Sequence, residues 1–336
     1  KLKIPWGLAF LPGNQAESML ITERGGHLRV YKHGELGKPV IDTPEVWSRG
    51  QGGLLDVALH PNFAENGWIY LAYSKESPSG NGEAFTAIAR GKIKGNRWVD
   101  HEMIFEVPER YHSPRGYHFG TRMAFKNGYL YFAVGDRGEK NKAQSVKYPQ
   151  GKHYRLHEDG RIPKDNPFQS KPESFPGLYT IGNRNPQGLT IHPRTGDLWS
   201  AEHGPRGGDE INRVQAGKNY GWPVVTHGMN YNGTPITDKT HAPGVEPPVF
   251  HWTPSIAVCG VDFYKGDRYP GWENQLFAGG LASEEVHRLK IENRKITESE
   301  IILSGAGRVR AVETGPDGYL YLILNGPGRI VRLIPR

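Results

Sequence analysis

The segment from Gly182 to Pro223 combines side chains that bind anions with groups that bind hard metal ions. It contains the runs GNRNPQGLTIHP and AEHGPRGGDEINRVQAGKNYGWP. The guanidinium of Arg184 is suited to a carboxylate or a phosphate, and Asn185 places an amide beside it. The carboxylate of Glu210, together with backbone carbonyls from the turns, is suited to a hard cation. This combination indicates a metal-assisted site for an anionic cofactor.

The adjacent carboxylates Asp209 and Glu210 have two other interpretations. As a pair they could act as the acid and base of a glycosidase. Neighbouring residues on a strand point to opposite faces, however, which disfavours a shared substrate. The structural alternative is a salt bridge from this pair to Arg206 or Arg213. Cation binding by Glu210 is the preferred hypothesis.

Further candidate residues lie where loops lead into apolar strands. His118, in RGYHFGTRMAF, can act as a general base near neutral pH, although a single histidine among 14 is more often a surface or packing residue. Arg308 and Arg310 are two residues apart, which predicts that they share a strand face and either hold an anion or face solvent. The amide of Gln51 can contact a ligand or close a turn. None of these residues by itself identifies a functional site.

The elements that must position these residues follow a repeated pattern. A short apolar strand, a turn with Pro, Asn or Gly, an aromatic-rich strand and a polar loop follow one another in six units. The turns recur at roughly 50–70 residues, near the spacing of propeller blades with inserted loops. The pattern predicts an all-β fold, a six-bladed β-propeller, as a single domain over residues 1–336. A pair of β-sandwiches is the alternative.

The longest polar inserts between the predicted strands are where a ligand site is expected. Loops on a rigid scaffold commonly carry function, and in a propeller the loops at one end converge on the central axis. The inserts span residues 76–83, 109–120, 138–176 and 228–247.

Composition narrows the class of protein. The chain has 336 residues with 44 Gly and 26 Pro, which favours many short strands joined by turns. The net charge of +7 is scattered and accompanies no nucleic-acid reader motif, so nucleic-acid binding is not expected. Cys259 is the single cysteine, which excludes an intramolecular disulfide. No apolar run reaches the length of a transmembrane span, and no signal peptide is recognised after Lys1.

The segments GNRNPQGL, EHGPRGGDEIN and GKNYGWP resemble those of the soluble quinoprotein sugar dehydrogenases, most nearly the aldose sugar dehydrogenase branch. The resemblance extends from PWGLAFLPG to GPGRIVRLIPR. It implies a six-bladed propeller that uses pyrroloquinoline quinone (PQQ) and calcium. Such an enzyme oxidises the C1 hydroxyl of aldose sugars to lactones by hydride transfer to the quinone and passes electrons to an external acceptor.

The resemblance also implies roles for individual residues. His118 matches the general base, and Arg184 matches the arginine that stabilises negative charge on the quinone oxygen, with Asn185 beside it. The carbonyls of Gly204 and Pro205 match those that hold the calcium bridging to PQQ. Further matches to cofactor-contacting positions are Gln51, Gln144, Arg308, Arg310 and, in the cleft wall, Tyr231. Matches to ligands of a second, structural calcium are Glu210 and the carbonyl of Tyr220.

The chain departs from the family pattern at two positions. Ala282 stands where the family often has a lysine against the cofactor, and Tyr117 stands where the glucose-specific branch has an aspartate. The large inserts that form dimers in that branch are not recognised, so a monomer is expected. Relatives imply a location in the periplasm or cell envelope. Two other functions remain open, a calcium-dependent lactonase-type hydrolase and a non-catalytic sugar-binding propeller.

Overall fold

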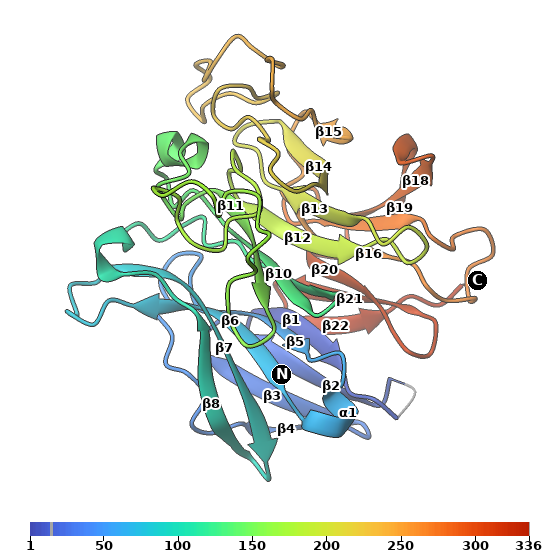
Figure 1. Ribbon diagram of the computed structural model, residues 1–336. Helices are drawn as coiled ribbons and strands as arrows, with labels where there is room; N and C mark the ends of the chain where they lie inside the picture. The colour runs from blue at the N-terminus through green and yellow to red at the C-terminus, as the bar shows by residue number, and fades with distance from the viewer. Residues whose placement is uncertain (14–15, 336) are drawn as a thin grey trace.

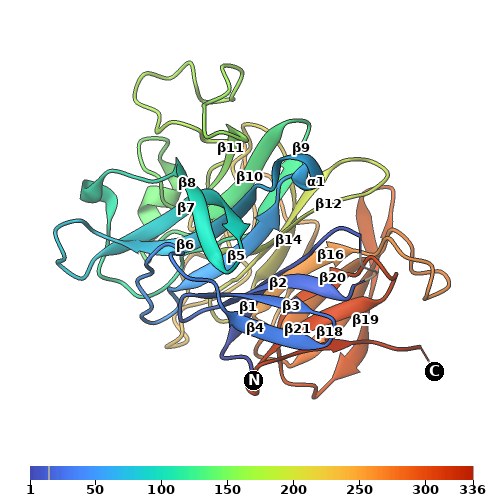
Figure 2. The same ribbon diagram turned by 90° about the horizontal axis from the view of Figure 1, so that it is seen from below.

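The computed structural model, which describes residues 1–13 and 16–335, contains six antiparallel sheets arranged around a common axis (Figure 1 and Figure 2). Each sheet is built from consecutive strands. The innermost strands β1, β5, β9, β12, β16 and β20 contact one another in a closed ring. The predicted all-β, six-bladed β-propeller is therefore confirmed.

Blade 1 contains, from the axis outward, β1 (Pro5–Phe10), β2 (Ser18–Glu23), β3 (His27–Lys32) and β4 (Glu35–Pro39). Blade 2 contains β5 (Leu54–Leu59), β6 (Ile69–Glu76), β7 (Ala84–Lys94) and β8 (Arg97–Phe105). Blade 3 contains β9 (Met123–Lys126), β10 (Tyr129–Val134) and β11 (Lys152–His157). The short helical segments of this half are α1 (Phe63–Asn66), η1 (Glu109–Tyr111) and η2 (Lys140–Gln144).

Blade 4 contains, from the axis outward, β12 (Pro186–Ile191), β13 (Leu198–Glu202), β14 (Asp209–Val214) and β15 (Phe250–Trp252). Blade 5 contains β16 (Val258–Phe263), β17 (Leu276–Gly280), β18 (Glu285–Glu292) and β19 (Lys295–Ser304). Blade 6 contains β20 (Arg308–Thr314), β21 (Leu320–Asn325) and β22 (Arg329–Arg332). Blade 6 packs directly against blade 1, as the red and blue ribbons show in Figure 1. No helix among residues 1–13 and 16–335 is long and apolar enough to cross a membrane.

The hydrophobic core lies between the blades. One cluster joins Tyr70 and Phe85 of blade 2 to Phe132 and Tyr154 of blade 3, and another joins Trp199 of blade 4 to residues of blade 5. Because each blade is covered on both faces, its inner strands are apolar without strict alternation. Strand β2, for example, is buried along its whole length.

The inner strands approach one another closely at glycines. A Cβ at Gly188 of β12 would lie 2.5 Å from the Cys259 carbonyl oxygen of β16, and a Cβ at Gly260 of β16 would lie 2.7 Å from Ala311 of β20. Such distances are too short for any side chain. Register shifts mark the same part of the strands, between Pro186 and Gly188 and at the corresponding places in β1, β5, β16 and β20. These bulges change the direction of side chains at the strand starts.

One predicted insert was partly wrong. Strand β11 lies within the segment 138–176 that was expected to be a loop. Its sequence KHYRLH reads as polar, yet it is almost entirely buried. The polar groups are satisfied inside the protein: the Lys152 ammonium, for example, donates to the carbonyl oxygens of Lys142 and Ala143, each at 2.9 Å.

Candidate active site

The candidate residues gather at one end of the propeller because of strand direction. Gln51 precedes β5, His118 precedes β9, Arg184 precedes β12, and Arg310 lies near the start of β20. In an antiparallel blade, the start of the first strand and the end of the second lie at the same end. Asp136, which follows β10, therefore joins this group. The structure brings these residues together from separate blades.

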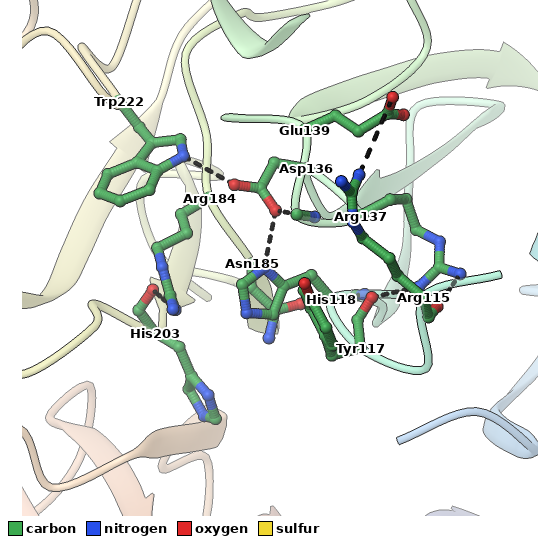
Figure 3. Close-up of polar contacts among 12 residues, drawn as sticks. Arg115, Tyr117, His118, Asp136, Arg137, Glu139, Arg184, Asn185, His203 and Trp222 are labelled. Atoms are coloured by element: carbon green, nitrogen blue, oxygen red, sulfur yellow. Dashed lines mark hydrogen bonds and ion pairs between the residues drawn. The ribbon is translucent and has the colours of Figure 1, made fainter. Parts of the chain in front are cut away.

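His118 is paired with Asp136. Its Nδ1 lies 2.6 Å from Asp136 Oδ1, and the side chain of Asp136 is 1% exposed (Figure 3). The Gly138 amide also donates to Oδ1, at 2.7 Å. Burial acts to raise the pKa of Asp136, but the hydrogen bond from His118 and the charge of Arg184 outweigh it and the pKa is lowered. An ionised Asp136 makes Nδ1 the donor, so Nε2 is the nitrogen that can accept a substrate proton.

The surroundings of His118 keep the imidazole neutral. Burial is the main cause that lowers its pKa, the hydrogen bond to Asp136 acts in the opposite direction, and the charge of Arg184 lowers it further. The backbone of His118 has a φ of 57° in the left-handed region, and its amide donates to Gln51 Oε1 at 2.9 Å. Gln51 thus holds the loop that carries His118.

Arg184 lies beside this pair (Figure 3). Its guanidinium donates to the carbonyl oxygens of His203, at 3.0 Å, and Gly204, at 2.8 Å, and its backbone amide donates to the carboxylate of Glu202. The amide oxygen of Asn185 accepts from the Gly120 amide at 3.1 Å. The predicted cluster of Arg184, Asn185 and the Gly204 turn therefore forms, with the Gly204 carbonyl already in contact with the guanidinium.

Arg310 extends the site toward the axis. Its terminal nitrogen donates to Gln187 Oε1 at 3.0 Å and lies 3.5 Å from the Cys259 sulfur. Its Nε is buried without a hydrogen-bond partner. Burial, and then the nearby charges of Arg122 and Arg308, lower the pKa of Arg310. A buried guanidinium with unused hydrogen-bonding capacity fits an anionic group such as a carboxylate of PQQ.

Three predicted cofactor residues have other surroundings. The amide of Gln144 makes two hydrogen bonds with the amide of Asn219, at 3.0 and 2.8 Å, and donates to the Trp222 carbonyl at 2.7 Å. Tyr231 is 73% exposed on the loop between β14 and β15. Arg308 is exposed at the start of β20. Cofactor contacts by these residues stay predictions.

Asp209 and Glu210 have separate surroundings. The Asp209 carboxylate accepts from the Gly204 amide at 2.8 Å, from Ser255 Oγ at 2.6 Å and from the Val258 amide at 2.9 Å. It therefore shapes the turn that begins at Gly204. Arg213, a possible salt-bridge partner of Glu210 from the sequence, instead lies 3.9 Å from Asp197.

Glu210 faces a second carboxylate, Glu202, which sequence reasoning did not select. The two residues are cross-strand partners in β13 and β14. Burial raises the pKa of Glu202 to about 7 and that of Glu210 to about 8, and the charge of Glu202 raises the pKa of Glu210 further. Asn183 donates to Glu202 and Asn212 donates to Glu210. A cavity of about 200 Å³ adjoins this pair and is lined by Glu210, Tyr220, Val225, Thr226 and His227, among others.

This arrangement fits a cation. Glu202 is buried and Glu210 is half-buried next to it, so a proton or a positive charge between the two carboxylates stabilises the pair. Over residues 1–13 and 16–335, no group of three or more His, Cys, Asp or Glu side chains is arranged to hold a metal ion. A calcium ion here would therefore depend on backbone carbonyls, such as that of Tyr220, in addition to Glu210.

Three functional candidates were missed from the sequence: Asp136, Glu202 and Trp222. Each is a buried side chain at the functional end of the propeller. Asp136 had a usable signal, because it directly follows the apolar strand YLYFAV, where a carboxylate has no packing role. Trp222 and Glu202 lie in the quoted motifs GKNYGWP and AEHGPRGGDEINRVQAGKNYGWP, but residue type alone gives no functional signal for either.

Comparison with known proteins identifies relatives over nearly the whole chain. The family model described as Glucose / Sorbosone dehydrogenase matches residues 2–332. The chain is 43% identical over 344 residues to the aldose sugar dehydrogenase YliI of Escherichia coli (strain K12), covering 100% of this chain and 91% of the relative.

Two solved structures extend the comparison. The apo form of the soluble aldose sugar dehydrogenase from Escherichia coli superposes with a TM-score of 0.94 at 42% identity, covering 100% of this chain and 97% of that one. The PQQ-bound aldose sugar dehydrogenase from Streptomyces coelicolor superposes with a TM-score of 0.77 at 27% identity, with 99% and 94% covered. With its fold and its full-length match, the chain belongs to the glucose/sorbosone dehydrogenase family.

Proposed function

We propose that this protein is a PQQ- and calcium-dependent oxidoreductase that oxidises the C1 hydroxyl of aldose sugars to lactones. The observation that carries the proposal is the His118–Asp136 pair beside the guanidinium of Arg184, with Arg310 at the same end of the propeller. A neutral base next to a positively charged pocket suits removal of a proton and a hydride from an alcohol. The relationship to aldose sugar dehydrogenases supports the choice of substrate class.

In this reaction, His118, Asp136, Arg184 and Arg310 would each have a separate role. Nε2 of His118 takes the proton of the C1 hydroxyl, and Asp136 stabilises the resulting imidazolium. Arg184 and Arg310 bind and orient the carboxylates and oxygens of the cofactor. Bound PQQ supplies the quinone that accepts the hydride. The protein therefore contributes mainly orientation and electrostatic stabilisation.

Calcium would occupy two places in this proposal. The carbonyls of Gly204 and Pro205 would hold one ion, and a carbonyl oxygen has two lone pairs, so contact with Arg184 does not prevent ligation. Glu210 and the Tyr220 carbonyl would hold the other ion, whose charge would neutralise the pair formed with Glu202. This second ion would have a structural role.

The setting of the enzyme is also proposed from its family. We infer a monomer in the periplasm or cell envelope that transfers electrons to an external acceptor. A lactonase-type hydrolase and a non-catalytic sugar-binding propeller are the competing functions. The pairing of His118 with Asp136 favours an enzyme over a non-catalytic propeller.

The decisive experiment uses the purified apo-protein with PQQ and calcium, in which reduction of a redox dye is followed with a panel of aldoses. We expect reduction only when PQQ, calcium and an aldose are all present. Omission of PQQ and replacement of calcium by a chelator are the controls, and lactone hydrolysis is measured in the same samples. Absence of dye reduction and of PQQ binding would refute the proposal, and lactone hydrolysis without PQQ would favour the hydrolase.

A further inference from the structure

Trp222 connects parts of the site that come from different blades. It lies in the loop between β14 and β15 of blade 4 and is 8% exposed. Its indole Nε1 donates to Asp136 Oδ2 at 2.8 Å, across 86 residues of sequence. Figure 3 shows the indole approaching one carboxylate oxygen while His118 approaches the other. The Asp136 carboxylate is therefore held from both sides.

The same indole also faces Arg184. The guanidinium carbon of Arg184 lies 5.4 Å from the centroid of the Trp222 ring, within the range of a cation–π contact. The backbone of Trp222 is fixed on both sides, because its amide donates to the Gly182 carbonyl at 2.9 Å and its carbonyl accepts from Gln144 at 2.7 Å. The ring thus has little freedom to move independently of the loop that carries Arg184.

We propose that Trp222 is a positioning residue that aligns His118 and its hydrogen-bonded partner Asp136 with the Arg184 guanidinium. The inference rests on the proposed function, in which His118 removes the substrate proton. Without the indole N–H, Asp136 Oδ2 loses its donor in a buried site and the carboxylate can rotate about its terminal bond. Nε2 of His118 then loses its fixed direction toward the substrate. Gln144, assigned by resemblance to the cofactor, acts here by holding the Trp222 loop.

The substitution Trp222→Phe removes the N–H and keeps an aromatic ring. The charged and titratable groups whose fields reach His118 are Asp136, Arg184 and Arg137, with His203 nearby. Asp136 would no longer share its charge with the indole, so its attraction for a protonated imidazole increases. The pKa of His118 should therefore rise in Trp222→Phe. It should fall in Asp136→Asn, because the negative charge is lost.

The first measurement is a nuclear magnetic resonance titration of the His118 imidazole in the apo-protein, with its signal assigned by its loss in His118→Gln. The matched control is Trp199→Phe, because the Trp199 Nε1 is buried without a hydrogen-bond partner. This control makes the same chemical change and should leave the His118 titration unaltered. Trp222→Leu, which also removes the ring, should raise the pKa of His118 as Trp222→Phe does.

The second measurement is turnover of the PQQ- and calcium-loaded protein. Trp222→Phe should lower kcat at least about tenfold through misorientation of the base, with KM for the aldose unchanged. The acidic limb of its pH profile should move to higher pH. An unchanged titration together with unchanged kcat in both Trp222 variants would overturn the inference. A shifted titration in a protein that oxidises no aldose would refute the proposed function and leave the positioning role standing.

Discussion

At the scale of single residues, surroundings decide which histidine can do chemistry. His153 is also buried, but its ring nitrogens contact Thr180 Oγ1 at 2.9 Å and Ser200 Oγ at 3.1 Å, and burial lowers its pKa to about 4. It is therefore a neutral structural group with both nitrogens occupied. His118 has one nitrogen on a carboxylate and a side chain that is 13% exposed. That difference makes His118 the candidate base.

Replacement of His118 should separate catalysis from cofactor binding. We expect His118→Gln to retain PQQ binding and to lose about 10²–10⁴-fold in kcat, the usual contribution of a general base. The base works only when deprotonated, so wild-type activity should be lost as the pH falls through a pKa below 6.5. Steady-state kinetics and PQQ titration measure both effects. His112→Gln in the same loop is the control, and wild-type turnover in His118→Gln would exclude this base.

At the scale of elements, the strand starts explain how the site is assembled. Bulges and close glycine contacts occur where the inner strands begin, next to Arg184 and Arg310. A missing Cβ lets neighbouring inner strands approach, and the bulge turns the polar side chains out of the regular alternation. The same local device recurs around the axis, so each blade can present different chemistry from an equivalent position.

The close approach of the inner strands can be tested at Gly188. In Gly188→Ala the new methyl group would meet the Cys259 carbonyl at 2.5 Å. We expect a loss of about 1–3 kcal/mol in the free energy of unfolding, the usual cost of overpacking. Gly25→Ala is the control, because no atom lies within 4 Å of the added carbon. Equal melting temperatures for the two variants would contradict the steric explanation.

The Glu202–Glu210 pair of β13 and β14 predicts a link between pH, calcium and stability. The folded-state pKa of Glu210 is raised from its ordinary value of 4.5 to about 8, so the folded protein binds the proton more tightly than the unfolded chain. The apo-protein should therefore lose stability as the pH rises from about 5 to 8, and calcium should restore it. Melting temperatures across this range, with and without calcium, measure the effect.

Two variants sharpen this test. Glu210→Gln should reduce the pH dependence between 5 and 8 and remove the calcium response, whereas Glu202 and Glu313, whose pKa values burial raises to about 7 and about 8, continue to titrate in this range. Glu298→Gln changes an exposed carboxylate on β19 and should behave as wild type. A full calcium response in Glu210→Gln would show that the ion binds elsewhere.

At the scale of the whole molecule, the ring depends on contacts across the axis. Each blade is one continuous segment, so no strand links blade 6 to blade 1 among the residues described. Arg122 of blade 3 donates to Asp56 of blade 2 at 2.6 Å and to the Trp6 carbonyl of blade 1 at 3.0 Å. It also reaches the Arg310 carbonyl of blade 6 at 3.5 Å. One buried side chain thus joins four blades.

Loss of this bridge should destabilise the propeller. Arg122→Met leaves Asp56 buried without its cation, and burial already raises the pKa of Asp56 in the presence of Arg122. We expect a loss of about 3–5 kcal/mol in the free energy of unfolding. Urea denaturation measures it, and the double variant Asp56→Asn with Arg122→Met should lose less than the sum of the two single variants. Wild-type stability in Arg122→Met would contradict the bridging role.

The sequence by itself determined the blade repeat, the turns and the cluster of Arg184, Asn185 and Gly204. These are local features: apolar runs, turn residues and short motifs lie within a few tens of residues, and their spacing is visible in the chain. Strand β11 was misread as a loop because its polar side chains are buried and find their partners inside the protein: backbone carbonyls for Lys152, and other side chains for His153 and Arg155. Residue type is a poor guide to burial in such a case.

Only the tertiary structure decided which groups surround the base. The partner of His118 is Asp136, its second support is Trp222 from another blade, and Glu202 meets Glu210 through strand pairing. These contacts depend on how blades pack and on which strand ends share one face of the ring. No periodicity in the chain encodes them, because each joins residues whose separation is set by intervening loops.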